Sequence, residues 1–524
     1  MEQYGLDELA ASAEAVLAGL GPLAAGLARL AGEAGGAVTL DAMEQLVAGR
    51  GRELLRGLVQ LALDGQAERE VRVPQVTGTD GVTRRRAERG HGRTVVTRLG
   101  AVVVRRIGYR SGIRGAGSLF PRDGVLNLPP CGFSWELQRL AEMFCRSGSY
   151  EQGHEFMRAA TGVSIGKRQL EQITVAAAGD AERFYRDRAA VPVAGEQDRD
   201  LEQVPEPGQG LPPLALSADG KGVAMLPEAR RRRTRAPEQK VRTFDKRAGT
   251  GEKKGCKRMA ETGAVFDVAV PDGPARTPEQ VMRPEGGSAR EKPPRAQNRW
   301  YACDITAGRD VTIGKIFAEA DRRDPDHLRT WIALVDGDIY QLGLFQAQAA
   351  ARGITLAVVI DFIHVLEYLW KAAWCFHAPR DPAMEDWVIA QGTDILHGRV
   401  TEVIARIAGL AGQHPPKAGS EHAKNIRKTL SYLQNKQPYM DYPRALAEGW
   451  PIATGVIEGA CRHLVQDRMG ITGARWGLDG AQAMLWLRAI NASGDTSAYW
   501  DYHITQEHQR NHQSRYQDTL ELAA

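Results

Sequence analysis

Residues 331–364 read WIALVDGDIYQLGLFQAQAAARGITLAVVIDFIH, and this stretch decides the fold. Its apolar runs IALVDGD and TLAVVID have the length and composition of buried strands, and residues 340–351 between them have the pattern of a helix. A second helix, HVLEYLWKAAWCFH, follows the second run directly. Because strands and helices alternate in this way, the sequence predicts a layered α/β domain.

The same domain extends in both directions from this stretch. Upstream, PLALSADG predicts a strand that opens the domain, and residues 301–304 predict another. Downstream, residues 382–440 are mostly helical with polar and basic faces. The predicted segments are an α/β core at 213–380 with a basic insertion at 228–299, an α-helical insertion at 381–445 and a final core helix at 446–495.

The region before this core is mainly helical. The segment TVVTRLGAVVVRRIGYRSG predicts a β-hairpin around Leu99–Gly100. Residues 150–160 and 167–177 predict a helix-turn-helix, although such short helix pairs also occur without a DNA role. Its second helix would present Lys167 and Arg168 to a DNA groove. The predicted parts are a helical region at 1–75, a β-hairpin module at 76–130, a helix-turn-helix region at 131–190, a linker at 191–212 and a C-terminal tail at 496–524.

The composition is that of a folded protein. Of its 524 residues, 43% are apolar and 25% are charged, which excludes a disordered chain. No apolar stretch reaches the roughly 18 residues of a membrane helix. The six cysteines form no CxxC pair, which favours a reducing compartment and argues against a zinc site. We therefore expect a cytoplasmic protein without a membrane partner.

Positive charge is concentrated locally. The net charge is only +4, yet the segment from Arg230 to Arg258 contains thirteen Lys and Arg residues and only three acidic residues. Such a block indicates contact with a polyanion such as DNA. From this block we expect phosphate contacts by Arg230, Arg231, Arg232, Arg233, Lys253 and Lys254. A second cationic and aromatic set, suited to phosphate and base contact, consists of Arg462, Arg468, Arg475 and Trp476.

Three acids stand where an apolar run meets a turn or a helix. Asp219 ends LALSAD, Asp336 ends IALVD, and Glu458 opens a helix in TGVIEGACRH. Taken singly, the first two are also compatible with Asp-Gly turns, and Glu458 with a helix-dipole partner. Three converging carboxylates suit a pair of Mg²⁺ or Mn²⁺ ions that act on a phosphodiester. Asp338 is a weaker alternative to Asp336.

A fourth acid, Asp361, lies three residues before His364 at a strand-to-helix junction. The pair is compatible with a plain N-cap whose carboxylate satisfies the histidine. It is equally compatible with a supporting pair that orients a metal ligand or a DNA phosphate. Asp361 could itself replace Asp336 as the second metal ligand.

Four segments resemble bacterial insertion-sequence transposases of the ISKra type, relatives of the Mutator-like DDE enzymes. They are LSADGKGV, LVDGD, VVIDFIHVLEYLWKAA and GVIEGACRHLVQDRMGITGARWGLDGAQAMLWLRA. The resemblance covers about residues 85–515. It implies an RNase H-like catalytic domain interrupted by an α-helical insertion, with the triad Asp219, Asp336 and Glu458. Asp361 and His364 would form the family's (Cys/Asp)-x-x-His motif. The zinc-ribbon cysteines of many relatives have no counterpart in GYRSGIRGAGSLFPRDG.

The expected function is therefore Mg²⁺-dependent cleavage and joining of DNA ends by a bacterial, nucleoid-associated transposase. No covalent intermediate with the enzyme is needed. Because two element ends must be paired, we expect a homodimer or a larger assembly on double-stranded DNA. Two alternatives remain open at this point: a catalytically inactive, transposon-derived DNA-binding regulator, and a metal-dependent nuclease of the same fold.

Overall fold

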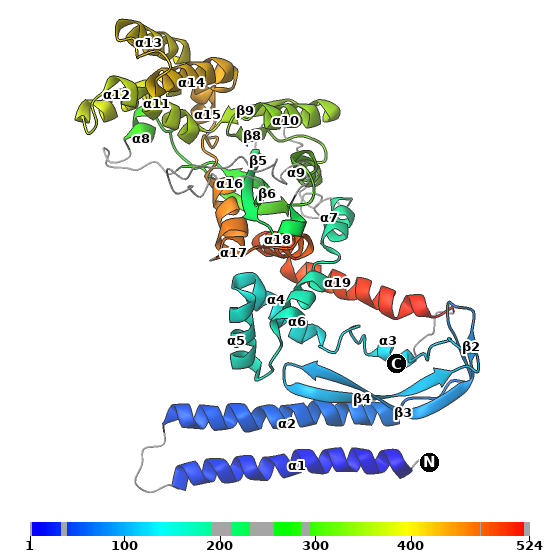
Figure 1. Cartoon of the computed structure of the whole chain (residues 1–524). Coiled ribbons are helices and arrows are strands. Elements are labelled where there is room, and N and C mark those ends of the chain that lie inside the picture. The colour runs from blue at the N-terminus through cyan, green and yellow to red at the C-terminus, as the bar shows by residue number, and fades with distance from the viewer. Residues whose placement is uncertain are drawn as a thin grey trace, which may run out of the picture. The chain divides into compact units, whose positions relative to one another are not determined.

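The computed structural model describes residues 3–32, 39–190, 211–230, 256–283, 293–471 and 473–517. The chain divides into two compact units, one of residues 1–180 with 497–524 and one of residues 181–496. Both contain helices and strands (Figure 1). Within the described residues, no helix combines the length and apolar character that a bilayer crossing requires.

The first unit begins with two long helices and a β-hairpin. Helix α1 (Gln3–Gly32) packs along α2 (Leu40–Glu68), which packs on strand β4 (Gly100–Arg110). Strand β3 (Arg86–Thr97) pairs with β4 so that Thr97 faces Gly100 across a two-residue turn. The predicted hairpin is therefore confirmed. The two-residue strands β1 (Val76–Thr77) and β2 (Thr83–Arg84) pair beside it.

Short helices complete this unit. They are α3 (Pro121–Val125), α4 (Trp135–Ser147), α5 (Tyr150–Thr161) and α6 (Lys167–Ala177). Ser149 accepts the N–H of Gln152 while the Gln152 side chain accepts the N–H of Ser149, a reciprocal cap that fixes where α5 begins. The predicted helix pair at 150–177 is thus present, with Leu137, Met157 and Leu170 in its shared core.

The predicted C-terminal tail is instead part of this unit. Residues 496–511 form helix α19 (Thr496–Asn511). The Tyr499 hydroxyl donates to the carbonyl of Ala177 at 2.5 Å, and His503 and Arg510 both bind the buried carboxylate of Asp180. A helix with these partners is ordered by burial rather than by its own sequence, so local composition gave no sign of its attachment.

Glu142 of α4 makes the stability of the first unit depend on pH. It is 1% exposed, and its burial raises its pKa to about 7, although Arg146 lies 3.1 Å away. The unfolded chain loses this proton near pH 4.5, whereas the folded unit keeps it until about 7. Stability therefore falls as pH rises from 4.5 to 7, by about 3 kcal/mol in total.

We expect Glu142→Gln to flatten this fall in the free energy of unfolding, measured by denaturant titration between pH 5 and 8. Glu136→Gln, at an exposed position of the same helix, is the control and should keep the wild-type slope. Equal slopes in both variants would contradict the assignment.

The second unit is built on a five-stranded sheet. Its strands are β5 (Leu214–Ala224), β6 (Lys257–Ala269), β7 (Arg295–Asp304), β8 (Trp331–Val335) and β9 (Leu356–Ile360), in the spatial order β7-β6-β5-β8-β9. Strands β5, β8 and β9 are parallel, whereas β6 and β7 are antiparallel to their neighbours. An α/β fold is therefore confirmed.

The predicted basic insertion at 228–299 is wrong in one respect. Residues 257–269 form β6, which pairs with β5 along its whole length and belongs to the core sheet, and β7 also begins inside the predicted insertion. The reason is that β6 is buried on the sheet while its flanks are polar. The segments 231–255 and 284–292, like most of the predicted linker at 191–212, lie outside the described residues.

Helices cover the sheet and protect its edge. Helix α9 (Arg309–Arg323) packs on β5, β6 and β7, and α10 (Ile339–Arg352) joins β8 to β9. Strand β8 is buried at every residue, as expected for a parallel strand between two neighbours. At the β7 edge, Ser493 accepts the N–H of Tyr301 and Gln482 that of Ile305. These bonds occupy an edge that could otherwise pair with another strand.

The predicted α-helical insertion is present. Its helices are α12 (Pro382–Leu396), α13 (Val400–Gln413), α14 (Glu421–Lys436) and α15 (Tyr442–Ala447). Helices α12 and α14 pack on α11 (Phe362–Phe376), and α13 packs on α14 and α12 (Figure 1). Tyr368 of α11 stacks on Tyr432 of α14 at 3.9 Å.

The predicted final helix at 446–495 is several pieces. They are α16 (Gly455–Ala460), the π-helical turn η4 (Cys461–Gln466), α17 (Asp467–Met469) and α18 (Leu478–Ala492). Between α17 and α18 the chain turns at Gly473, whose φ of +69° favours glycine. The helical periodicity of the sequence does not reveal this break, because each piece is helical by itself.

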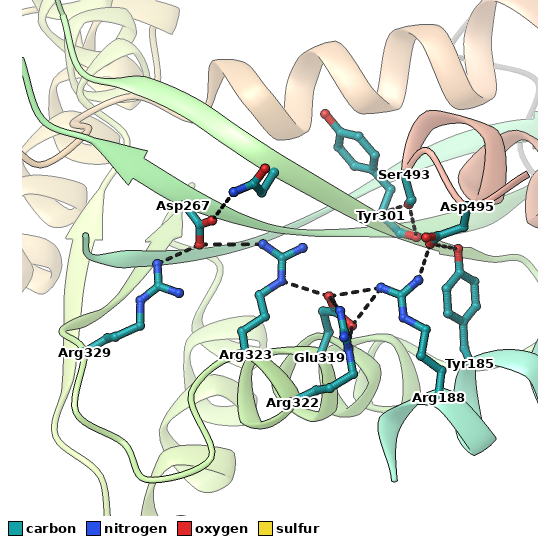
Figure 2. A network of polar contacts seen from close by, with 11 residues as sticks. Tyr185, Arg188, Asp267, Tyr301, Glu319, Arg322, Arg323, Arg329, Ser493 and Asp495 are labelled. Carbon is teal, nitrogen blue, oxygen red and sulfur yellow. Dashed lines mark hydrogen bonds and ion pairs between the residues drawn. The ribbon is translucent and has the colours of Figure 1, made fainter. Parts of the chain in front are cut away.

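An ion-pair network surrounds Glu319 of α9 (Figure 2). Glu319 is 4% exposed and contacts Arg188, Arg322 and Arg323 at 2.8–3.3 Å. Burial alone would raise its pKa, but these arginines outweigh burial and lower it. Further members are Asp267 with Arg329, and Asp495 with Arg188 and Tyr185.

Candidate active site

Three of the candidate acids lie on or directly after the parallel strands: Asp219 lies on β5, and Asp336 and Asp361 come directly after β8 and β9. Leu214 of β5 pairs with Trp331 of β8, and the same offset relates Asp219 to Asp336. Val335 pairs with Ile360 of β9, so Asp336 and Asp361, which come directly after this pair, are neighbours as well. Neighbouring strands are about 4.8 Å apart. This register therefore places three acids from distant parts of the sequence on neighbouring strands, near the carboxyl ends of β8 and β9.

The turn after Asp336 fixes the position of the Asp336 carboxylate. Gly337 has a φ of +95°, and the Asp336 carboxylate accepts the N–H of Asp338 at 2.9 Å. Asp338 itself caps α10 by accepting the N–H of Gln341 at 2.8 Å and pairs with Arg309. Asp338 thus has a structural role, in agreement with its place as the weaker candidate.

Asp219 lies beside the helical segment that carries Glu458. The Asp219 carboxylate is half-buried and accepts the N–H of Gly220 at 2.6 Å. The thiol of Cys461, one turn after Glu458, lies close enough to the same carboxylate to feel its charge. Burial, together with the charge of Asp219, raises the pKa of this thiol. Cys461 therefore links the first and third predicted acids.

Asp361 is the most enclosed of the acids. Its side chain is fully buried and accepts hydrogen bonds from Ile363 N–H at 2.9 Å, His364 Nδ1 at 2.8 Å and Thr454 Oγ1 at 2.5 Å. Burial alone would raise the pKa of Asp361, but the bonds from His364, Thr454 and the backbone lower it. The bond to Asp361 raises the pKa of His364 to about 9, and the Asp336 carboxylate adds to this. His364 is thus cationic at neutral pH.

Glu458 of α16 joins this pair. Its carboxylate is exposed and lies 3.3 Å from the Thr454 hydroxyl. Ligand atoms of Asp361, His364 and Glu458 all lie within 4.8 Å of one another. Asp219 and Asp336 are outside this group. The other such group within the described residues, Asp180, His503 and Glu507, is bound by Arg510, which occupies it as an ion would.

Asp336 and Asp361 are alternative candidates for the second metal ligand, and their hydrogen bonds differ. Three donors already occupy the oxygens of Asp361, which suits an anchor. Among the described residues, the only donor that hydrogen-bonds the Asp336 carboxylate is the N–H of Asp338. This difference leaves the Asp336 oxygens more accessible to a metal ion than those of Asp361, whereas proximity groups Asp361 and not Asp336 with Glu458.

The predicted DNA-contacting residues differ in exposure. Arg168 is exposed near the start of α6, whereas Lys167 pairs with Glu151 of α5. Arg230 is half-buried, and its side chain donates to the carbonyl of Met225 at 3.5 Å. The remaining members of the basic block lie outside the described residues: Arg231, Arg232, Arg233, Lys253 and Lys254.

The second predicted DNA-contacting set, around α17, contains both exposed and buried residues. Arg462 and Arg475 are exposed. Arg468 and Trp476, by contrast, are 3% and 7% exposed, and the guanidinium stacks 4.8 Å from the indole. The Trp476 backbone also pairs with Ala224 and Leu226. The prediction that Arg468 and Trp476 contact DNA is not supported in this structure, because burial assigns them to packing beneath β5.

Two residues of the site were not singled out from the sequence. The Thr454 hydroxyl makes no cap bond for α16 and donates to Asp361 instead. Cys461 is one of the six cysteines that form no CxxC pair. The spacing of both from Glu458, four residues before and three after, is the signal that could have found them.

No protein-family model matches the chain, and no curated protein matches it significantly.

Proposed function

We propose that the chain is a DNA transposase of an insertion sequence, which cleaves and joins DNA ends by phosphoryl transfer. The observation that carries this proposal is the placement of acids on neighbouring elements. Asp219 lies on β5 and Asp336 comes directly after the parallel strand β8. Cys461 brings the Glu458 segment beside Asp219, and Thr454 hydrogen-bonds Asp361 and lies 3.3 Å from Glu458. An edge lined by carboxylates has the donor set that Mg²⁺ or Mn²⁺ takes.

The sheet supports the RNase H-like fold that this function implies. Three antiparallel strands, β7, β6 and β5, are followed across the sheet by two strands parallel to β5. The first acid lies on the central strand β5 and the second follows its parallel neighbour β8. The third arrives from α16 after the α-helical insertion.

In this proposal Asp219, Asp336 and Glu458 would hold the metal ions. The bound metals would stabilise charge on the entering and leaving oxygens of the phosphodiester. Water would first attack the phosphodiester at the element end, forming a P–O bond on the 5′-phosphate and releasing the element's 3′-hydroxyl. That hydroxyl would then attack a phosphodiester of target DNA, forming a new P–O bond while the target's own 3′-oxygen leaves as a hydroxyl. Asp361 keeps the His364 cation beside the carboxylates, where it can face a DNA phosphate.

The DNA contacts would come from several parts of the chain. Helices α5 and α6 have the length of a helix-turn-helix, and Arg168 is exposed on the second of them. Exposed Arg462 and Arg475 lie on the chain shortly after Glu458. Since two element ends must be paired, the active form would be a homodimer or a larger assembly on DNA.

The test is incubation of the full chain with DNA that carries its own element ends and Mg²⁺. We expect wild type to nick and join these ends and Asp219→Ala to lose both reactions while it still binds the ends. Asp272→Ala, at an exposed loop position, is the matched control.

Other outcomes would separate the alternatives. End binding by wild type without cleavage in Mg²⁺ or Mn²⁺ would favour the inactive regulator. Cleavage without joining, on DNA unrelated to the element, would favour a nuclease. Full activity of Asp219→Ala would overturn the assignment of the site.

A further inference from the structure

The segment just before α16 is fixed to the start of α11 by two hydrogen bonds. The N–H of Phe362 donates to the carbonyl of Ile452 at 2.9 Å. The hydroxyl of Thr454 donates to the carboxylate of Asp361 at 2.5 Å. These bonds join two points that are separated in sequence by the whole α-helical insertion.

Thr454 is in an unusual state for the residue that precedes a helix. Ser or Thr at this position commonly accepts an N–H of the first helical turn. Thr454 makes no such bond, and its backbone (φ −83°, ψ 20°) is not the extended conformation of an ordinary cap. Its side chain is 5% exposed and lies between two carboxylates, that of Asp361 and, at 3.3 Å, that of Glu458.

Glu458 stands one helical turn beyond Thr454. Its N–H donates to the carbonyl of Thr454 at 3.0 Å, so the two side chains lie on one face of the turn. Because Glu458 is exposed and lies in the first turn of its helix, its direction depends on how this end of the helix is attached. The attachment nearest to it is Thr454.

We propose that Thr454 is a positioning residue of the phosphoryl-transfer site, which holds Glu458 in register with the strand acids by anchoring α16 to Asp361. The inference rests on the proposed function. Hydrogen-bonded partners of metal ligands commonly affect metal affinity or activity by roughly 10- to 100-fold. Thr454 would act through Glu458 and Asp361 and would not itself contact the reacting atoms.

The test compares Thr454→Val, which keeps the β-branched shape, with Thr454→Ser, which keeps the hydroxyl. In the full chain we expect Thr454→Val to slow DNA-end cleavage and to raise the Mn²⁺ concentration for half-maximal rate, each by roughly 10- to 100-fold. Thr454→Ser should stay within about threefold of wild type. Thr429→Val is the matched control, because within the part of the chain that the structure describes the buried Thr429 hydroxyl bonds only the carbonyl of Tyr368.

A second measurement, Mn²⁺ binding to the DNA-free protein by electron paramagnetic resonance, separates this inference from the proposed function. Weaker Mn²⁺ binding by Thr454→Val, restored in Thr454→Ser, supports the positioning role even without cleavage. Wild type that cleaves DNA alongside an equally active Thr454→Val would overturn the role and leave the function standing. Wild type that neither cleaves DNA nor binds Mn²⁺ would overturn both. If Thr454→Val does not fold, Thr454→Ala, which also removes the hydroxyl, is measured by the same criteria.

Discussion

Replacing Glu458 by Gln is expected to lower DNA-end cleavage and joining by at least about 1,000-fold. Bound metals contribute several kcal/mol of charge stabilisation in such reactions, and each 1.36 kcal/mol changes a rate tenfold. Glutamine keeps the size of the side chain but removes the charge that would hold the ion. Since Glu458 is exposed, its replacement should leave the fold and the affinity for DNA ends unchanged.

Single-turnover cleavage in Mg²⁺ and an end-binding assay in Ca²⁺ would measure the two effects separately. Glu448→Gln is the control, because Glu448 is an exposed acid in the same part of the chain and pairs only with Arg444 among the described residues. Cleavage by Glu458→Gln at the rate of the control would exclude Glu458 as a metal ligand.

The parallel half of the sheet could be predicted because its signals are local. Strands β8 and β9 are continuous apolar runs with an acid directly after each, β5 begins with an apolar run that leads to Asp219 within the strand, and a helix separates β8 from β9. The row formed by Asp219, Asp336 and Asp361 required the strand pairing as well. The β5–β8 pairing joins residues more than a hundred positions apart, which no local pattern records.

The errors have a common physical cause. Strand β6 lies within a basic, Gly-rich part of the sequence, and only its pairing with β5 and β7 shows that it is core. Helix α19 is fixed by Asp180 and Ala177, more than three hundred residues away. Arg468 and Trp476 read as surface residues from their type, yet they are buried against each other. In each case tertiary burial overrode residue type.

The ion-pair network around Glu319 predicts the largest effect on stability. Replacing Glu319 by Ala would leave Arg188, Arg322 and Arg323 close together without the acid that they share (Figure 2). Breaking a buried ion pair by removing one partner costs about 3–5 kcal/mol when the remaining charge is left uncompensated. Arg188 keeps its pair with Asp495 and Arg323 its contact with Asp267, so the lower end of this range is expected here. We expect Glu319→Ala to lower the free energy of unfolding of the second unit by an amount of this order, measured by denaturant titration.

An exposed pair in the same unit separates burial from charge. Arg283 and Asp386 are 2.6 Å apart, but both side chains are more than 60% exposed. Exposed pairs contribute about 0–1 kcal/mol, so Asp386→Ala should change stability little although the distance is as short. If both substitutions had the same small effect, the Glu319 network would contribute no more than a surface ion pair. A large effect of Glu319→Ala alone would mean that the ion pairs of α9 hold α7 (Ala181–Ala189) and strand β6 in place. Glu319 of α9 contacts Arg188 of α7, and Arg323 of α9 contacts Asp267 of β6.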